Sequence, residues 1–162
     1  MRAQELRKLE CCTQLMETLE FQIDTRKGGH SRHEVIFYDF VISGQRFGDI
    51  INLETLDKVS PFSDTLRLSD KLWHIDSLTF KVESTLTSGR TILYVCPECG
   101  DLECGVVSMK MEATEETIIW KDFGIETNLE GLVEAWELLD IEFDKKAYLT
   151  SFENLEILLR TT

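Results

Sequence analysis

The stretch TILYVCPECGDLECGVVSMKMEATEETIIWKDFGI, residues 91–125, decides the fold that the sequence predicts. Residues 91–96 are rich in β-branched and aromatic side chains, while 105–114 and 116–125 carry alternating or β-branched apolar side chains. Each segment is therefore expected to form a strand. The turn between the first two strands, 96–105, holds three cysteines, three carboxylates and two glycines. Short connections join neighbouring antiparallel strands, so the stretch predicts a three-strand meander.

The sequence before this stretch predicts a helix and a hairpin. Apolar residues recur every three or four positions in 6–19, which is typical of a helix. The period changes to two over 19–24, and 33–42 is apolar on both faces in its middle, so two strands are expected there. The segment RFGDII, 46–51, is expected to pair back as a short return strand.

The segment between the hairpin and the meander predicts a short helix and one more strand. Asn52 is expected to cap a helix of one or two turns that ends before Pro61. DSLTFKVEST, 76–85, is predicted to form a strand, and 86–90 a turn.

The end of the chain predicts two helices. Residues 127–139 combine a capping-box spacing, Thr127 and Glu130, with an apolar stripe. Residues 144–160 begin at Asp144, a good N-cap, and carry the clearest helical periodicity. DIEF, 140–143, is expected to be a short strand or a linker. The predicted class is α+β, a mostly antiparallel sheet (an N-terminal hairpin plus a three-strand meander) packed with C-terminal helices. The absence of a repeat or linker predicts one domain, 1–162.

The charge of the chain is one-sided, with 17 Lys+Arg against 30 Asp+Glu and a formal net charge of −13. This balance disfavours nucleic acid and anionic membranes as partners, because both are bound through basic surfaces. No apolar run is long enough for a membrane span and no leader is recognisable, so a cytoplasmic location is expected.

The acidic residues concentrate in the second half of the chain. Such a field predicts a basic protein partner, since complementary potentials speed association, with an ordinary solvated surface as the alternative. The candidate partner-binding residues are Asp101, Glu103, Glu115, Glu116, Asp122, Glu126, Glu130 and Glu134.

The turn residues Cys96, Cys99 and Cys104 allow three interpretations. An odd total of five cysteines without an export signal favours reduced thiols. A C-x-x-C turn between strands resembles half of a zinc site, with a fourth ligand to come from elsewhere. The candidate fourth ligands are Cys11, Cys12, His30, His33, His74 and Asp101.

The two other interpretations need no metal ion. Thioredoxin-like chemistry is disfavoured because a strand, not a helix, is expected after the turn, and because nearby carboxylates are expected to raise a thiol pKa. The third interpretation is a rigid reverse turn that is shaped by its glycines and needs no cofactor. No cofactor is therefore predicted, and a bound zinc ion is the alternative.

The segment 94–128 resembles a family of small bacterial proteins of unassigned function. The family pattern is a C-G-D-x-x-C-G turn, an alternating strand and a W-x-D-F-G segment, and 41–51 is also similar. The matching residues are Cys99, Gly100, Asp101, Cys104, Gly105, Trp120, Asp122, Phe123 and Gly124. Glu103 departs from the pattern, where a small residue is expected. The resemblance implies no catalytic mechanism.

Two functions from different classes follow from these features. The first is an acidic protein-binding domain, for example an immunity or antitoxin-type protein that neutralises a basic toxin. The alternative is a zinc-binding or thiol-based enzyme centred on the three-cysteine turn. The sequence contains no phosphate-binding loop, no dinucleotide-binding fingerprint and no H-E-x-x-H motif, so the prediction leans away from an enzyme.

Overall fold

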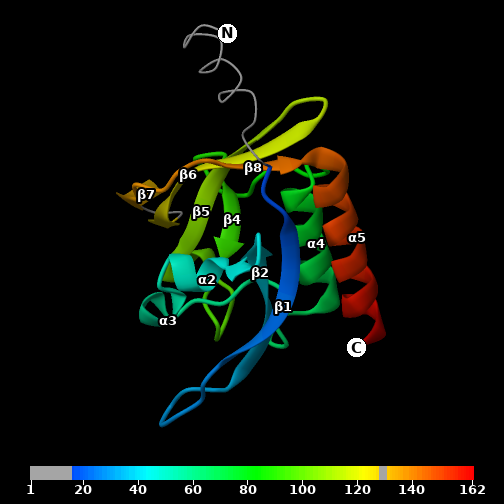
Figure 1. Cartoon of the computed structure of the whole chain (residues 1–162). Coiled ribbons are helices and arrows are strands. Elements are labelled where there is room, and N and C mark those ends of the chain that lie inside the picture. Colours follow the sequence, from blue (N-terminus) through cyan, green and yellow to red (C-terminus); the bar gives the residue numbers. More distant parts are fainter. Residues whose placement is uncertain (1–15, 128–130) are drawn as a thin grey trace, which may run out of the picture.

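Two antiparallel sheets share one hydrophobic core in the computed structural model of the chain, which describes residues 16–127 and 131–162 (Figure 1). The first sheet contains β1 (Leu19–Arg26), β2 (Val35–Ile42) and β3 (Gln45–Arg46). The second sheet contains β4 (Thr91–Tyr94), β5 (Val106–Ala113), β6 (Thr117–Thr127), β7 (Gly131–Ala135) and β8 (Ile141–Asp144). The helices are α2 (Phe47–Ile50), α3 (Leu53–Leu56), α4 (Leu68–Leu78) and α5 (Lys145–Thr161), and a 3-10 turn, η1, spans Leu102–Cys104. The predicted α+β class is confirmed.

The predicted N-terminal hairpin is confirmed. β1 and β2 pair without interruption from Leu19↔Ile42 to Arg26↔Val35. β2 is buried on both faces from Asp39 to Ile42, as its apolar middle predicts. The return strand is shorter than predicted, because β3 ends at Arg46 and the chain enters α2, which buries Phe47 in the core.

The predicted meander is confirmed, and its last strand, β6, pairs with two further strands that the sequence did not predict as its partners. β4, β5 and β6 are neighbours in sequence order. β6 is eleven residues long and pairs with β8 over 117–120 and with β7 over 124–127. The register of β5 and β6 shifts between Ser108 and Lys110, where Asp122 has a positive φ of 52°, so the sheet contains a bulge at this point.

The predicted helix over 127–139 is wrong, because 131–135 forms β7; its proposed capping residue Glu130 lies outside the described residues. The free edge of β6 can form backbone hydrogen bonds with 131–135 when this segment is a strand. A short helix at this position would leave that edge unpaired and would itself be only marginally stable. Gly124 makes the close pairing feasible, since a Cβ there would lie 2.3 Å from the carbonyl oxygen of Glu134. The strand pairing therefore overrides the helical pattern, and 141–144 is a strand, β8.

The predicted strand over 76–85 is also wrong. Its first residues belong to α4, whose Ile75 and Leu78 face the core at helical spacing. The hydroxyl of Thr79 donates back to the carbonyl oxygen of Ile75 at 2.8 Å, which supports the end of the helix. The short helix predicted after Asn52 is confirmed as α3, but the Asn52 side chain makes no capping hydrogen bond.

The C-terminal helix begins as predicted, with the Asp144 carboxylate accepting a hydrogen bond from the backbone N–H of Ala147 at 2.9 Å. α5 packs beside α4 and against β1 (Figure 1). Its Tyr148 joins three elements, because its hydroxyl donates to the carbonyl oxygen of Leu78 at 2.8 Å and accepts from Trp120 Nε1 at 3.1 Å. No helix in the described ranges is long and apolar enough to cross a membrane.

The first described residues of the chain lie against β8 and the first half of α5. The N–H of Glu17 donates to the carbonyl oxygen of Glu142 at 2.8 Å. The hydroxyl of Ser151 in α5 donates to the carbonyl oxygen of Leu19 in β1 at 2.6 Å. The predicted helix over 6–19 lies almost wholly outside the described residues, and its last position, Leu19, begins β1.

Candidate metal centre

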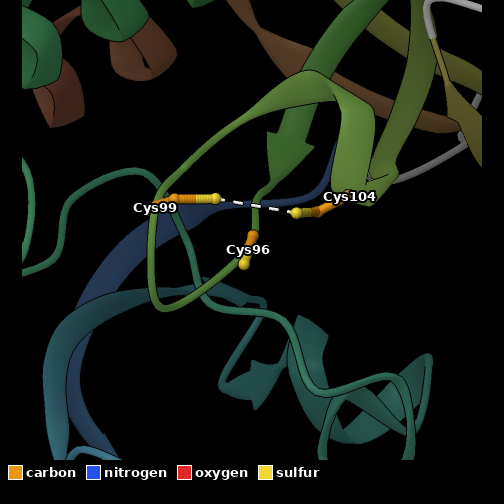
Figure 2. Close-up of side chains that lie close together, drawn as sticks. All are labelled: Cys96, Cys99 and Cys104. Carbon is orange, nitrogen blue, oxygen red and sulfur yellow. Dashed lines mark hydrogen bonds between the residues drawn. The ribbon is translucent and has the colours of Figure 1, made fainter.

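The three-cysteine turn brings its sulfur atoms to one point. Cys96 follows β4, Cys99 lies in the turn and Cys104 ends η1 (Figure 2). The three Sγ atoms all lie within 4.8 Å of one another, and those of Cys99 and Cys104 are 3.6 Å apart. Sulfur ligands of tetrahedral zinc lie about 3.8 Å apart, because each Zn–S bond is about 2.3 Å long. The turn therefore has the dimensions of three corners of a zinc site.

The backbone of the turn is folded by a glycine and an aspartate. Gly100 has a φ of +66°, and its N–H donates to the carbonyl oxygen of Cys96 at 3.0 Å, which reverses the chain between Cys96 and Cys99. Asp101 accepts a hydrogen bond from the N–H of Glu103 at 3.1 Å and so begins η1. These local bonds place Cys104 beside the C-x-x-C pair.

Backbone N–H groups point at the sulfur atoms. Burial raises the pKa of the Cys96 thiol, but the N–H groups of Cys99 and Glu98 and the two neighbouring thiols outweigh burial and leave its pKa below the ordinary value. The N–H of Asp101 lies 3.3 Å from the sulfur of Cys99. Such donors stabilise a thiolate, which is the form that binds metal.

The pKa of Cys104 is shifted by the neighbouring thiols and not by the nearby carboxylates. The pKa of Cys104 is raised to about 11, because the thiols of Cys99 and Cys96 interact with it more favourably while it is protonated. The nearby carboxylates do not raise the pKa of Cys96, contrary to the sequence-based expectation, since the Glu98 carboxylate points away toward two basic residues. A divalent cation would favour ionisation of all three thiols.

Residues distant in sequence anchor the turn to the rest of the fold. Glu98 accepts hydrogen bonds from Arg26 at 2.8 Å and from the His33 ring at 2.8 Å, and these partners lower its pKa to about 2. Lys58 donates to the carbonyl oxygen of Cys104 at 2.8 Å. The sequence did not reveal Arg26 or Lys58, because neither lies in a motif. The one signal in the sequence was the negative charge of Glu98, between Cys96 and Cys99, which calls for a basic partner.

The candidate fourth ligands do not converge on this point in the described part of the chain, where no histidine or carboxylate joins the three-sulfur group. His33 is engaged by Glu98, and the Asp101 carboxylate caps η1. His74 is buried in α4, and His30 lies in the exposed β1–β2 connection. Cys11 and Cys12 lie outside the described residues.

The candidate acidic residues that the structure describes do not form one group. Asp101 and Glu103 are exposed in the cysteine turn, and Glu115 and Glu116 are exposed in the β5–β6 turn. Exposed Asp122 pairs with Lys110 and exposed Glu134 lies on β7, so these two residues belong to further parts of the sheet. Glu130 lies outside the described residues.

Glu126 is the exception, and its assignment to a partner-binding surface is wrong. Its side chain is only 1% exposed and is paired with buried Arg90. It faces inward because Ser88 and Ser108 donate hydrogen bonds to its carboxylate at 3.0 and 2.7 Å.

Comparisons with known proteins found no matching family model, no matching curated protein and no matching solved structure. The resemblance of 94–128 to a bacterial family therefore stays a prediction.

Proposed function

We propose that this protein binds a zinc ion through Cys96, Cys99 and Cys104. The observation that carries the proposal is the convergence of their Sγ atoms within 4.8 Å. Three thiolate ligands favour a soft or borderline cation such as Zn²⁺ over Mg²⁺ or Ca²⁺, which prefer oxygen. The backbone donors around Cys96 and Cys99 offset part of the repulsion among the thiolates.

The proposed role of the ion is to fix the turn against the rest of the fold. The turn touches the first sheet through Glu98 and Arg26, and it touches the segment after α3 through Lys58. An ion that cross-links three side chains would hold both contacts in one geometry, and its binding energy would add to folding. Reduced thiols are required, so the proposal includes a reducing, cytoplasmic location.

Elemental analysis of freshly purified protein tests the proposal. We expect about one zinc ion per chain, lost in the triple variant Cys96→Ser, Cys99→Ser, Cys104→Ser. Cobalt substitution should give thiolate-to-cobalt charge-transfer absorption in the parent and none in the triple variant. The matched double variant Cys11→Ser, Cys12→Ser should keep the cobalt spectrum of at least three thiolates. Metal-free protein that binds no cobalt after reduction would refute the proposal.

A second proposed function, binding of a basic protein, is favoured by the β7 surface. We define this surface as Leu132, Val133, Glu134, Glu137, Leu139 and Asp140. Leu139 is 90% exposed and Val133 is 55% exposed, although both are large apolar side chains. β7 is the last strand of its sheet, so within the described ranges its outer edge has no strand partner (Figure 1). Apolar side chains beside carboxylates on a sheet edge are typical of a protein-binding surface.

Charge complementarity selects a basic partner, because the chain has a net charge of −13 and the β7 surface contributes three carboxylates and no cation. A narrower form of this proposal is an immunity-type protein that neutralises a basic toxin. Affinity capture of a basic protein encoded beside this chain, followed by titration of the purified pair, tests it. Val133→Lys should weaken that complex at least tenfold, and Ile157→Lys on α5 should not. Equal effects of the two substitutions would refute the assigned surface.

A further inference from the structure

A cavity of about 370 Å³ lies between the β1–β2 hairpin and the segment containing α2 and α3. Its apolar contribution comes from Phe37 and Leu53, and the other lining side chains are mainly charged. The volume is in the lower range of pockets that bind small organic molecules. The cavity is separate from the three sulfur atoms, none of which lines it.

The lining is unusual for this chain because cations are as frequent as anions in it. Five basic and four acidic side chains line the cavity, whereas the whole chain has 17 basic and 30 acidic residues. The basic residues are Arg26, Lys27, Arg32, Arg46 and Lys58, and the acidic residues are Asp24, Asp49, Glu54 and Asp57. The charge balance of the cavity lining therefore differs from the acidic balance of the whole chain.

One group of side chains at the cavity, around Arg46, is mainly acidic. Arg46 is the cation there, and it is already paired with Asp24 and lies 3.6 Å from the buried carboxylate of Asp39. Asp49 is close enough to Asp39 to affect its ionisation, and its own carboxylate has no hydrogen bond or ion pair in the described part of the chain. A cationic group of a ligand could therefore form an ion pair with the Asp49 carboxylate.

A second group of lining side chains, around Asp57, is mainly basic. Asp57 neutralises only part of it, accepting hydrogen bonds from Arg26 at 3.0 and 3.1 Å and from Arg32 at 2.8 Å. Lys27 follows Arg26 directly and has no hydrogen bond or ion pair among the described residues. Arg32 is half exposed and uses one terminal nitrogen for Asp57. An anionic group of a ligand would find Lys27 and Arg32 available.

The lining shows one further sign of a built site. Asp57, which pairs with two of the lining arginines, has a left-handed φ of 50°. Strained backbone clusters at binding sites. Behind the lining, the buried Asp39 carboxylate lies 3.6 Å from Arg46 Nε, so these two groups neutralise each other.

We infer that this cavity binds a small zwitterion, a free amino acid, with its ammonium group toward Asp49 and its carboxylate toward Lys27 and Arg32. Opposite charges in the two groups favour a ligand that carries both charges over one that carries either alone. Phe37 and Leu53 provide apolar contact for the body of the ligand. This binding activity goes beyond the proposed zinc site and does not depend on it.

Thermal denaturation of the full chain with each common free amino acid, at about 5 mM, tests the inference first, since a ligand that binds only the folded state raises the midpoint. The amino acid with the largest effect is then titrated calorimetrically beside its amide and its N-acetyl form. These derivatives each remove one charge and should bind at least tenfold more weakly. A midpoint unchanged by every amino acid would overturn the inference, and so would equal binding of the three forms.

Two variants locate the binding. Asp49→Asn and Lys27→Gln each remove one unpaired charge from the cavity, so folding should be unaffected while affinity falls about tenfold. Glu153→Gln and Lys146→Gln remove the same charges from the exposed face of α5 and should leave affinity unchanged. Full affinity in both cavity variants would overturn the assignment. Zinc content measured on the same samples separates this result from the fate of the metal proposal.

Discussion

The guanidinium of Arg90 and the carboxylate of Glu126 form a buried ion pair, with Nε 3.3 Å from Oε1 and side chains that are 4% and 1% exposed. Arg90 also donates to the backbone carbonyl oxygens of Ser108, at 3.1 Å, and of Asp122. Ser108 borders the bulge between β5 and β6, and Asp122 lies in it. The pair therefore holds a place where the strand ladder is interrupted.

Removing the cation should destabilise the protein strongly. Arg90→Met leaves the Glu126 charge buried without its partner, and we expect a loss of about 3–5 kcal/mol in the free energy of unfolding. Lys110→Met is the matched control, because its ion pair with Asp122 is more than half exposed and contributes less than about 1 kcal/mol. Urea denaturation measures both. Similar losses in the two variants would contradict a buried, structural role for Arg90.

Gly124→Ala should detach β7 from the sheet. A methyl group at this position would lie 2.3 Å from the Glu134 carbonyl oxygen and 3.0 Å from Leu132, so the strands have to separate. We expect a loss of about 1–3 kcal/mol and faster hydrogen exchange over 131–135. Gly29→Ala, where nothing lies within 4 Å, should change neither quantity. Protected amides in β7 of the Gly124 variant would refute the close packing.

Gly100→Ala should weaken metal binding. Its φ of +66° is strained for alanine, and the added methyl group would lie 2.8 Å from Leu66. The turn would open and cobalt affinity should fall at least about tenfold. Gly44→Ala is the control, because its φ of +84° imposes comparable strain with no neighbour within 4 Å and no contact with the cysteines. Its cobalt affinity should equal that of the parent, and an equal loss in both would point to general destabilisation.

Two buried groups should make stability nearly independent of pH between pH 4.5 and 6. Burial raises the pKa of Asp39 from 3.8 to about 6, although hydrogen bonds from Tyr94 and from the Phe40 N–H oppose the shift. Its stabilising contribution is present at low pH and lost as pH rises through 6. Burial lowers the pKa of His74 from 6.5 to about 4, so its contribution is present at high pH and lost as pH falls through 4. Each effect amounts to about 3 kcal/mol, and the two have opposite signs.

Single substitutions should reveal each slope. Asp39→Asn leaves the histidine alone, so the free energy of unfolding should increase from pH 4.5 to 6. His74→Gln leaves the carboxylate alone, so the free energy of unfolding should decrease over the same interval. Urea midpoints at several pH values measure both slopes. Parallel profiles in the parent and the two variants would show that neither group titrates as its burial requires.

The parts of the fold that the sequence predicted are those in which pattern and pairing are local. The meander and α5 follow from residues a few positions apart, and Asp144 caps α5 from the adjacent position. The segment 131–135 carries a helical pattern, but its conformation is decided by the free edge of β6 and the missing side chain of Gly124. Such competition for backbone hydrogen bonds is not encoded in periodicity.

The candidate site was predictable in its ligands and not in its geometry. Cys96, Cys99 and Cys104 were identifiable by spacing, whereas their convergence depends on the positive φ of Gly100. The contact between Arg26 and Glu98 joins residues 72 positions apart, so only the tertiary fold brings them together. The charged cavity is assembled in the same way, from the hairpin and from the segment after it.

The hydrogen bond from Ser151 to the carbonyl oxygen of Leu19 spans 132 positions of the chain. A ribosome therefore releases β1 long before it makes the helix that covers it. β1 and β2 can pair as soon as both are made. Until α5 emerges, however, Phe21 lacks its contact with Phe152 and is exposed to aggregation with other chains. β1 is made early but completes its contacts only when α5 packs against it, so resistance to proteases should appear once α5 has emerged from the ribosome.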